Sequence, residues 1–357
     1  MTLVRKRRHQ QALRLSLPPP PPPSSTDDFH SPPPQPVTLP TSPDIIKNLS
    51  DLNKLAVLGH GNGGTVYKVH HQRSSSIYAL KVLRFNNQNN NNAAAPPPMM
   101  ISHQAAAREA EILKRVDSQF IVKCHAVFHT ISGGGGELCF VMEHMEGGSL
   151  YEALRAHEKL SEDVISRVAQ CVLKGLQYLH GMKIVHRDIK PSNLLINAKG
   201  EIKIADFGVS RIVGSGNVGN ACCEGCMGTC AYMSPERVDP ERWDGDDNAD
   251  GFAGDVWSVG VVVLECLVGH YPLIGMGEKP DWAALIWGIC FGERLEIPES
   301  ASPEFRSFVW RCLEKDWRKR GSVEELLQHP FVNKRSFTTS CASATSNHGL
   351  LDFAFHA

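Results

Sequence analysis

Residues 186–193 have the sequence HRDIKPSN, and the tripeptide DFG follows at residues 206–208. Aspartate can accept a proton, lysine can balance phosphate charge, and carboxylate and amide oxygens are ligands that Mg²⁺ accepts. In chain order these groups are Asp188, Lys190, Asn193 and Asp206. A lone aspartate would ordinarily be a helix cap or a turn residue, but this string holds four matched groups in the order that phosphoryl transfer requires.

A glycine pattern upstream is a second chemical signal. Gly59, Gly61, Gly64 and Val66 form G-x-G-x-x-G-x-V, and glycines let backbone amides approach phosphates because no Cβ stands in the way. Alone the pattern is weak, since a dinucleotide-binding fingerprint has the same glycine spacing. That fingerprint opens a helix, whereas residues 65–69 (TVYKV) continue as a strand, which favours a loop that covers phosphates between two strands.

These strings, together with Lys81 in the sequence YALK at residues 78–81, resemble the protein kinases. The resemblance implies an α+β, bilobal fold with a β-rich N-lobe, one main N-lobe helix and an α-rich C-lobe, and it implies ATP and Mg²⁺ as cofactors. It makes Asp188 the base, Lys190 a charge-balancing group, and Asn193 and Asp206 the Mg²⁺ ligands. Lys81 would neutralise the α and β phosphates while a helix carboxylate holds it in place.

Two carboxylates compete for the role of the partner of Lys81. The family pattern Arg-Glu-x-x-x-Leu is matched by Arg108, Glu109 and Leu113, so Glu109 is favoured over Glu111. The other interpretation of Lys81 is a solvated surface lysine, and the glycines upstream argue against it.

The resemblance also implies an ATP-binding set. Its members are Leu58, Gly59, Gly61, Gly64, Val66, Ala79, Lys81, Met142, Glu143, Met145 and Leu195. Met142 takes the gatekeeper position, although it is equally well explained as a core residue. The backbone of Glu143 and Met145 would hydrogen bond to adenine.

On the substrate side, Lys190 is of the Ser/Thr-kinase type. Thr229 would contact Asp188 and Lys190 to seat a hydroxyl substrate, so tyrosine-only specificity is not expected. Other landmarks are expected to be structural, namely the SPE sequence at residues 234–236, the D-x-W-S-x-G pattern at 255–260, and Arg320, placed to pair with Glu236.

Three longer segments narrow the resemblance. MEHMEGGSL at residues 142–150, HRDIKPSNLLIN at 186–197 and GTCAYMSPER at 228–237 closely resemble the mitogen-activated protein kinase kinases, and VGHYPL at 268–273 with PDW at 280–282 looks most like their short plant branch. The resemblance implies dual-specificity phosphorylation of Thr and Tyr in a MAP kinase activation loop, under an upstream MAP kinase kinase kinase, in plant stress signalling. The alternative is a weakly active, kinase-like scaffold that binds a MAP kinase through its N-terminal tail.

Composition predicts three regions. Residues 1–51 hold a basic start and a proline run, which cannot bury a core, so a disordered tail is expected. Alternating apolar residues from Leu52 predict antiparallel strands, and helical apolar spacing from Leu150 predicts a mainly α lobe. The expected organisation is a kinase domain at residues 52–333, with an N-lobe at 52–145 and a C-lobe at 149–333, then a tail at 334–357.

Charge and cysteine content limit the expected partners and the expected cellular location. The formal net charge of −1 gives no overall attraction to nucleic acid or membrane, so neither is expected as a partner. The chain has 11 cysteines and no secretory pattern, which indicates reduced thiols and a cytosolic or nuclear location. The longest apolar run, residues 256–268, is short for a bilayer and contains Glu265, so a buried core helix is predicted.

The N-terminal tail has the form of a MAP kinase docking motif. It combines a basic run with alternate leucines, in the order Arg5, Lys6, Arg7, Arg8, Leu13, Leu15 and Leu17. Basic residues can meet an acidic patch while the leucines fill grooves in an extended peptide. A nuclear localisation patch and an organelle transit peptide are the alternatives, and the proline run at residues 18–23 disfavours the second.

One segment departs from the family. Members are switched on by phosphorylation of hydroxyl residues shortly before residue 229, but Gly219, Ala221 and Gly225 occupy the expected positions. Only Ser210 and Ser215 remain between residues 206 and 229, which makes Ser215 the candidate phosphosite. A zinc site is the less favoured interpretation of the cysteines in the same loop, which are Cys222, Cys223, Cys226 and Cys230.

Overall fold

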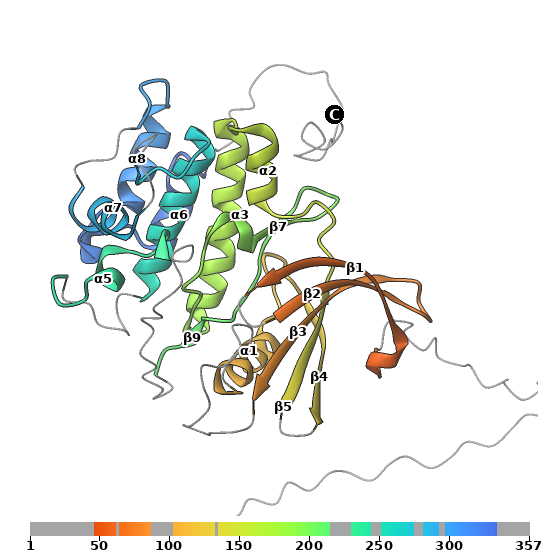
Figure 1. The fold of residues 1–357 in the computed structure, drawn as a ribbon. Coiled ribbons are helices and arrows are strands. Elements are labelled where there is room, and N and C mark those ends of the chain that lie inside the picture. Colours follow the sequence, from red (N-terminus) through yellow and green to blue (C-terminus); the bar gives the residue numbers. More distant parts are fainter. Residues whose placement is uncertain are drawn as a thin grey trace, which may run out of the picture. The chain divides into compact units, whose positions relative to one another are not determined.

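A computed structural model describes residues 46–61, 64–86, 103–132, 135–214, 230–243, 251–274, 281–292 and 297–333 (Figure 1). The first part of this region is a β-sheet with one helix, and the later part is mainly helical. The described structure begins before the predicted domain boundary at residue 52. Ile46 is buried against Leu52 in a small apolar cluster, and Leu49–Asp51 form a 3₁₀ turn.

The N-lobe is a five-stranded antiparallel sheet with the strand order β1-β2-β3-β5-β4. Its strands are β1 (Leu52–Gly61), β2 (Gly64–His71), β3 (Ile77–Asn86), β4 (Cys124–Ser132) and β5 (Gly135–Glu143). Helix α1 (His103–Arg115) lies against one face of this sheet (Figure 1). The apolar face of this helix is clear, since Ala106, Ala110, Ile112 and Leu113 are all buried.

The period-two alternation of strand β3 decides which way its side chains point. Tyr78, Leu80 and Val82 join the apolar cluster on one face of the sheet, whereas Leu83 and Phe85 join the main core that includes α1. Lys81 shares the parity of Leu83 and Phe85. The strand therefore directs this lysine to the face that α1 covers.

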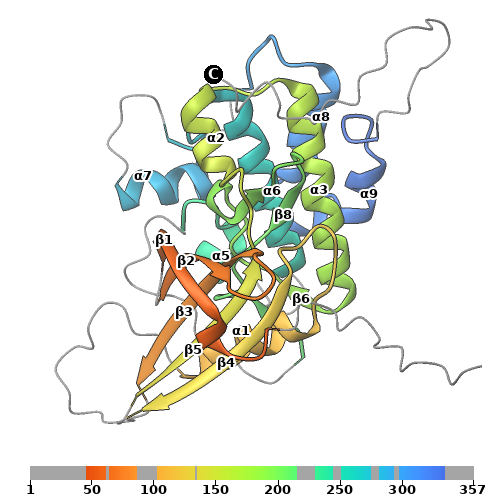
Figure 2. The same ribbon diagram turned by 90° about the vertical axis from the view of Figure 1, so that its right-hand side faces the viewer.

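The C-lobe is built around two long helices, α3 (Glu162–Gly181) and α6 (Gly251–Val268), which lie side by side in Figures 1 and 2. The other helices are α2 (Leu150–His157), α5 (Pro235–Val238), α7 (Trp282–Ile286), α8 (Pro303–Cys312) and α9 (Val323–Gln328). Short strands complete the described part: β6 (Ile184–Val185), β7 (Leu194–Ile196), β8 (Ile202–Ile204) and β9 (Arg211–Ile212). A π-helical turn, Trp287–Phe291, continues α7, and 3₁₀ turns span Pro191–Asn193 and Trp317–Lys319.

Helix α6 is the centre of the C-lobe. By length and apolar composition it could cross a membrane, but 72% of its most apolar window is buried inside the protein, which fits the predicted core helix. Close packing explains one of its glycines. A Cβ at Gly260 would lie 2.6 Å from the Cβ of Cys312, so α8 can approach α6 only where there is no side chain.

A buried ion pair connects Glu236 on α5 with Arg320, which precedes α9. Arg320 donates from two nitrogens to the carboxylate of Glu236, at 2.8 and 3.0 Å, and neither side chain is exposed. Arg320 also donates to the carbonyl oxygen of Ala253, at 2.8 Å. The predicted pairing of Arg320 with Glu236 is therefore present.

We expect Arg320→Ala to lower the free energy of unfolding by about 3–5 kcal/mol, because Glu236 would remain as a buried carboxylate without its partner. The matched control is Arg318→Ala, since Arg318 is largely exposed and pairs with Asp316 at the surface. That change should cost less than about 1 kcal/mol. Urea denaturation of the purified variants measures both, and similar small losses would show that the buried pair does not stabilise the fold.

Candidate active site

Two nested strand pairs bring the HRDIKPSN and DFG segments together. Strand β6 precedes the first segment and pairs with β9, which follows the second. Strand β7 follows the first segment and pairs with β8, which precedes the second. Residues 186–193 and 205–210 are therefore two loops held at both ends by the same pairs of strands. This pairing places Asp188 and Asp206 in one site although 18 residues separate them in the chain.

Lys81 lies at the meeting point of three elements. Its Nζ is 2.6 Å from Oε1 of Glu109 on α1 and 2.8 Å from Oδ1 of Asp206 in the loop after β8. Glu111 instead forms an exposed pair with Arg115 on the same helix. The carboxylate that holds Lys81 is thus Glu109, the residue that the sequence pattern favoured.

The charges of these side chains shift the pKa values of Lys81 and Asp206. Burial alone would lower the pKa of Lys81, but the carboxylates of Asp206 and Glu109 outweigh it, so the pKa is raised and the ammonium stays charged. The charge of Lys81 also lowers the pKa of Asp206 to about 2, although 46% of the Asp206 side chain is exposed. Lys81 is therefore a fixed cation between two carboxylates.

The catalytic-loop residues form a second polar cluster. Oδ2 of Asp188 accepts hydrogen bonds from Nζ of Lys190 and Nδ2 of Asn193, both at 2.8 Å. Nδ2 of Asn193 also donates to the carbonyl oxygen of Asp188, at 2.9 Å. Oδ1 of Asp188 is buried and has no partner among the described residues. A buried acceptor without a donor is costly, so this oxygen is suited to receive a hydroxyl from a substrate.

The remaining oxygens fit a magnesium ion. Both protons of the Asn193 amide point to Asp188, which leaves its Oδ1 as an acceptor. Asp206 uses Oδ1 for Lys81 and for the backbone N–H of Gly208, and its Oδ2 accepts no hydrogen bond from the described residues. One carboxylate and one amide oxygen are the donor set that Mg²⁺ takes when phosphate oxygens and water complete its shell.

Asp255, at the start of α6, shapes the loop that carries Asp188. Its carboxylate accepts the backbone N–H groups of His186, at 2.9 Å, and Arg187, at 2.8 Å. Burial would raise the pKa of Asp255, but hydrogen bonding to His180 and the backbone lowers it, so the group is ionised. The sequence marked Asp255 only as a structural landmark. Its D-x-W-S-x-G pattern was the available signal, but the contact with the loop could not be seen from it.

Most of the predicted ATP-binding set lies on strands β1, β2, β3 and β5. The strand registers place Val66 opposite Lys81 and Ala79 opposite Met142, so these residues line one region of the sheet. Leu58 is 48% exposed, as expected of an apolar side chain that a base would cover. Residues 62 and 63, at the tip of the loop, lie outside the described residues, and so do the side-chain surroundings of Gly61.

Two glycines of the loop have different roles. Around Gly59 the space within 4 Å of a Cβ is open, which leaves room for a phosphate. A Cβ at Gly64 would lie 2.5 Å from the carbonyl oxygen of Val82. Gly64 is therefore required by the packing of β2 on β3, and phosphate access alone does not explain it.

The rest of the predicted ATP-binding set lies on β5, in the segment between β5 and α2, and on β7. Met142 and Met145 are buried, and Leu195 on β7 is partly buried against the same apolar core. The backbone N–H of Met145 has no hydrogen-bond partner among the described residues. It is a donor available to a base.

Several predicted residues lie outside the described part of the chain. These are Thr229, Ser215, the docking residues Arg5, Lys6, Arg7, Arg8, Leu13 and Leu15, the positions Gly219, Ala221 and Gly225, and the loop cysteines Cys222, Cys223 and Cys226. Ser210 is described. It is 1% exposed and its hydroxyl donates to the carbonyl oxygen of His186, so it is a structural residue.

Comparison with known proteins decides the family. Residues 52–332 match the family described as protein kinase domain. Mitogen-activated protein kinase kinase 10 of Arabidopsis thaliana is 54% identical over 335 residues, which cover 94% of this chain and 100% of that protein. The chain belongs to the MAP kinase kinases.

Two further relatives of this chain are also named mitogen-activated protein kinase kinases. Mitogen-activated protein kinase kinase 9 of Arabidopsis thaliana is 49% identical over 80% of this chain and 85% of its own length. Mitogen-activated protein kinase kinase 7 of the same plant is 45% identical over 94% of this chain and 99% of its own length. The predicted family and the predicted α+β kinase fold are both confirmed.

Proposed function

We propose that this MAP kinase kinase transfers the γ-phosphoryl group of ATP to a threonine and a tyrosine in the activation loop of a MAP kinase. The observation that carries the proposal is the assembled pair of clusters, Lys81 with Glu109 and Asp206, and Asp188 with Lys190 and Asn193. The relatives that cover nearly the whole chain are themselves named mitogen-activated protein kinase kinases, which supports the choice of substrate.

The chain's own groups divide the work of transfer. The unpartnered Oδ1 of Asp188 accepts the substrate hydroxyl and orients it, and Lys190, whose Nζ is 2.8 Å from Asp188, balances charge on the group being transferred. Lys81, held in place by Glu109 at 2.6 Å, neutralises phosphate charge. Thr229 is assigned to seating the hydroxyl substrate next to Asp188.

Magnesium would be held by Oδ1 of Asn193 and the carboxylate of Asp206, the two groups whose oxygens remain after their internal hydrogen bonds are counted. When bound, the ion neutralises the phosphate oxygens and fixes their positions. Asp206 is ionised at any working pH, since its pKa is about 2, so it does not have to lose a proton before it binds a cation.

We expect Asp188→Asn to slow phosphoryl transfer by at least about 10²- to 10⁴-fold, the usual contribution of a positioned base. ATP affinity should stay near the wild-type value, because Asp188 belongs to the substrate side of the site. Radiolabelled transfer and calorimetric ATP binding measure the two properties. A variant that loses ATP affinity in parallel with transfer would contradict the assigned role, since the loss would then reflect a damaged site.

The substrate assignment is tested with purified full-length protein and a panel of MAP kinases made inactive by substitution. We expect transfer to Thr and Tyr of the activation loop in at least one panel member, identified by phosphopeptide mapping. The matched control is Asp188→Asn, which should transfer to none. The protein is assayed with and without an active upstream kinase, since the loop lacks hydroxyls at positions 219, 221 and 225.

The alternative outcome of the panel is binding without transfer. Wild-type protein that captures a MAP kinase but never phosphorylates one, with or without the upstream kinase, would favour the scaffold function. If the protein phosphorylated only serine or threonine residues of generic substrate proteins, it would be a protein kinase with a different class of substrate.

We propose that the basic and leucine-rich start of the chain docks the MAP kinase. Removal of residues 1–17 should raise the apparent KM for the MAP kinase, while a generic peptide substrate is used as before, because the motif is remote from the active-site clusters in sequence. Added salt should weaken binding of the intact chain more than binding of the truncated chain, because exposed charge pairs are screened over about 8 Å at physiological ionic strength. Equal binding by both proteins would leave the segment as an import signal or an unused tail.

A further inference from the structure

A hollow separates part of helix α1 from the N-lobe sheet. Its volume is about 390 Å³, which is within the range of cavities that bind ligands. On the sheet side it is lined by Phe85 on β3, Leu138 on β5 and His129 on β4. None of the described residues that line it belongs to the assigned active site.

Small side chains on α1 leave this space open. One face of the helix lines the hollow, with the residues His103, Ala106, Ala107, Ala110, Glu111 and Lys114. The three alanines extend only a methyl group toward the sheet, so helix and strands do not fill the space between them as they would in a packed core. The lining is mainly apolar, and Glu111 and Lys114 are exposed at its rim.

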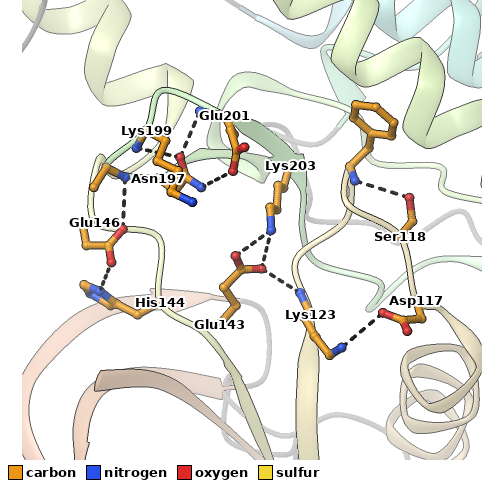
Figure 3. Close-up of polar contacts among 12 residues, drawn as sticks. Asp117, Ser118, Lys123, Glu143, His144, Glu146, Asn197, Lys199, Glu201 and Lys203 are labelled. Carbon is orange, nitrogen blue, oxygen red and sulfur yellow. Dashed lines mark hydrogen bonds and ion pairs between the residues drawn. The ribbon is translucent and has the colours of Figure 1, made fainter. Parts of the chain in front are cut away.

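The C-terminal end of α1 is firmly held, so the hollow does not come from a loosely attached helix. Asp117, just after α1, pairs with Nζ of Lys123 at 3.4 Å (Figure 3). The backbone N–H of Lys123 donates to Oε2 of Glu143 at 3.2 Å, and Nζ of Lys203 donates to Oε1 of Glu143 at 2.6 Å (Figure 3). A ligand in the hollow would therefore act on the part of α1 between this fixed end and His103.

Residues 351–355, with the sequence LDFAF, lie outside the described residues and have the composition that this hollow requires. Alternate side chains of an extended peptide point the same way, so Leu351, Phe353 and Phe355 would share one side. Residues 338–349, which precede this segment closely, are small or polar. Such a spacer has little to bury, whereas three large apolar side chains are stabilised by leaving water.

The described chain ends close enough to α1 for this segment to reach the hollow. Nε2 of Gln170 on α3 donates to the carbonyl oxygen of Val332 at 3.4 Å. About 12 Å further along α3, the hydroxyl of Tyr178 accepts the backbone N–H of Asp117 at 2.9 Å. These contacts place the near end of the hollow within about 40 Å of Val332. Residues 334–350 can extend over up to about 56 Å.

The charge at the rim suits the one acidic residue of the segment. Glu111 already pairs with Arg115, at 2.6 Å, whereas Lys114 forms no ion pair with the described residues. A segment that turns Leu351 and Phe353 into the hollow turns Asp352 outward, toward the rim. The Lys114 ammonium group can therefore meet the Asp352 carboxylate.

Residues 99–101, with the sequence MMI, are the competing occupant. They precede α1 closely and lie outside the described residues, so they could cover the end of the hollow at His103. The hollow continues along α1 to Lys114, about 16 Å away. An extended peptide of residues 351–355 spans about 13 Å, which matches that length better.

We propose that residues 351–355 dock in the hollow of their own chain and fill the space between α1 and the sheet. Ala106 and Ala110, which line the hollow, flank Glu109 in the helix, so the docked segment holds this carboxylate against Lys81. This regulation goes beyond the proposed function. It supplies a restraint on α1 that does not require phosphorylation of the loop, which lacks hydroxyls at positions 219, 221 and 225.

Photocrosslinking of the full-length protein tests the docking directly. Benzoylphenylalanine is placed at residue 353, and crosslinked peptides are identified by mass spectrometry. We expect crosslinks within one chain to residues 103–114 or to β4. The same probe at residue 337 is the matched control, because Phe337 is an aromatic residue of the same segment without alternating apolar neighbours. Its crosslinks should not concentrate at the hollow.

Filling the hollow should displace the segment. Ala107 is exposed at the hollow, so Ala107→Trp should occupy the space and reduce the crosslink from residue 353 at least about tenfold, since the cavity cannot hold both groups. Ala107→Ser changes the same position without filling the space and should keep the crosslink. The melting temperature of each variant reports whether the fold is intact.

Hydrogen exchange measures the effect on α1. Phe353→Asp combined with Phe355→Asp should speed amide exchange in residues 103–114 about three- to tenfold, because the helix then opens more often. Phosphoryl transfer to a generic peptide substrate should fall in parallel. Phe337→Asp should change neither property.

Three results would overturn the inference. Crosslinks that join two chains would assign the hollow to a second copy. Faster exchange in Met99→Ser with Met100→Ser, but not in Phe353→Asp with Phe355→Asp, would assign it to residues 99–101. Identical crosslinks from residues 353 and 337 would show that the segment does not dock. Docking in a protein that phosphorylates no MAP kinase would keep the inference and reject the proposed substrate.

Discussion

The ammonium group of Lys81 is the interaction on which the functional arrangement depends. It contacts Glu109 from α1 and Asp206 from the loop after β8, so one cation joins the sheet, the helix and the segment with the metal-binding carboxylate. Electrostatics makes the contact mutually reinforcing, because each carboxylate raises the pKa of the lysine and the lysine lowers that of Asp206. Displacement of α1 would take Glu109 away from Lys81 and leave Asp206 as the only carboxylate of the three groups in contact with the lysine.

Motifs with fixed spacing were the part of this site that the sequence could predict. Asp188, Asn193 and Asp206 were found because short strings specify loops whose geometry repeats wherever the string occurs. Glu109 was chosen over Glu111 for the same reason, and the structure pairs Lys81 with Glu109. The α+β division also followed from local signals, namely the period-two alternation before residue 145 and helical spacing after it.

Contacts between distant segments were the part that could not be predicted. Lys203 and Glu143 are 60 residues apart, and neither lies in a pattern that identifies the other. Asp255 was visible in a motif, but its hydrogen bond to the backbone of His186 spans 69 residues and depends on how α6 packs. The need for Gly64 was similarly hidden, since it arises from the carbonyl oxygen of Val82 on the neighbouring strand. Such partners are chosen by tertiary packing, on which local composition carries little information.

The position of Asp255 at the start of α6 has a consequence for how activity is encoded along the chain. Arg187 has a φ of 71° and Asp206 a φ of 65°, conformations that cost energy for residues other than glycine and persist only where the surroundings impose them. Part of that restraint comes from a carboxylate encoded well downstream of both loops. A shortened transcript that ended before residue 251 would still encode every glycine, lysine and aspartate of the ATP and metal sites. Its product would lack the group that holds the backbone of residues 186 and 187, so the motifs alone would not make it a kinase.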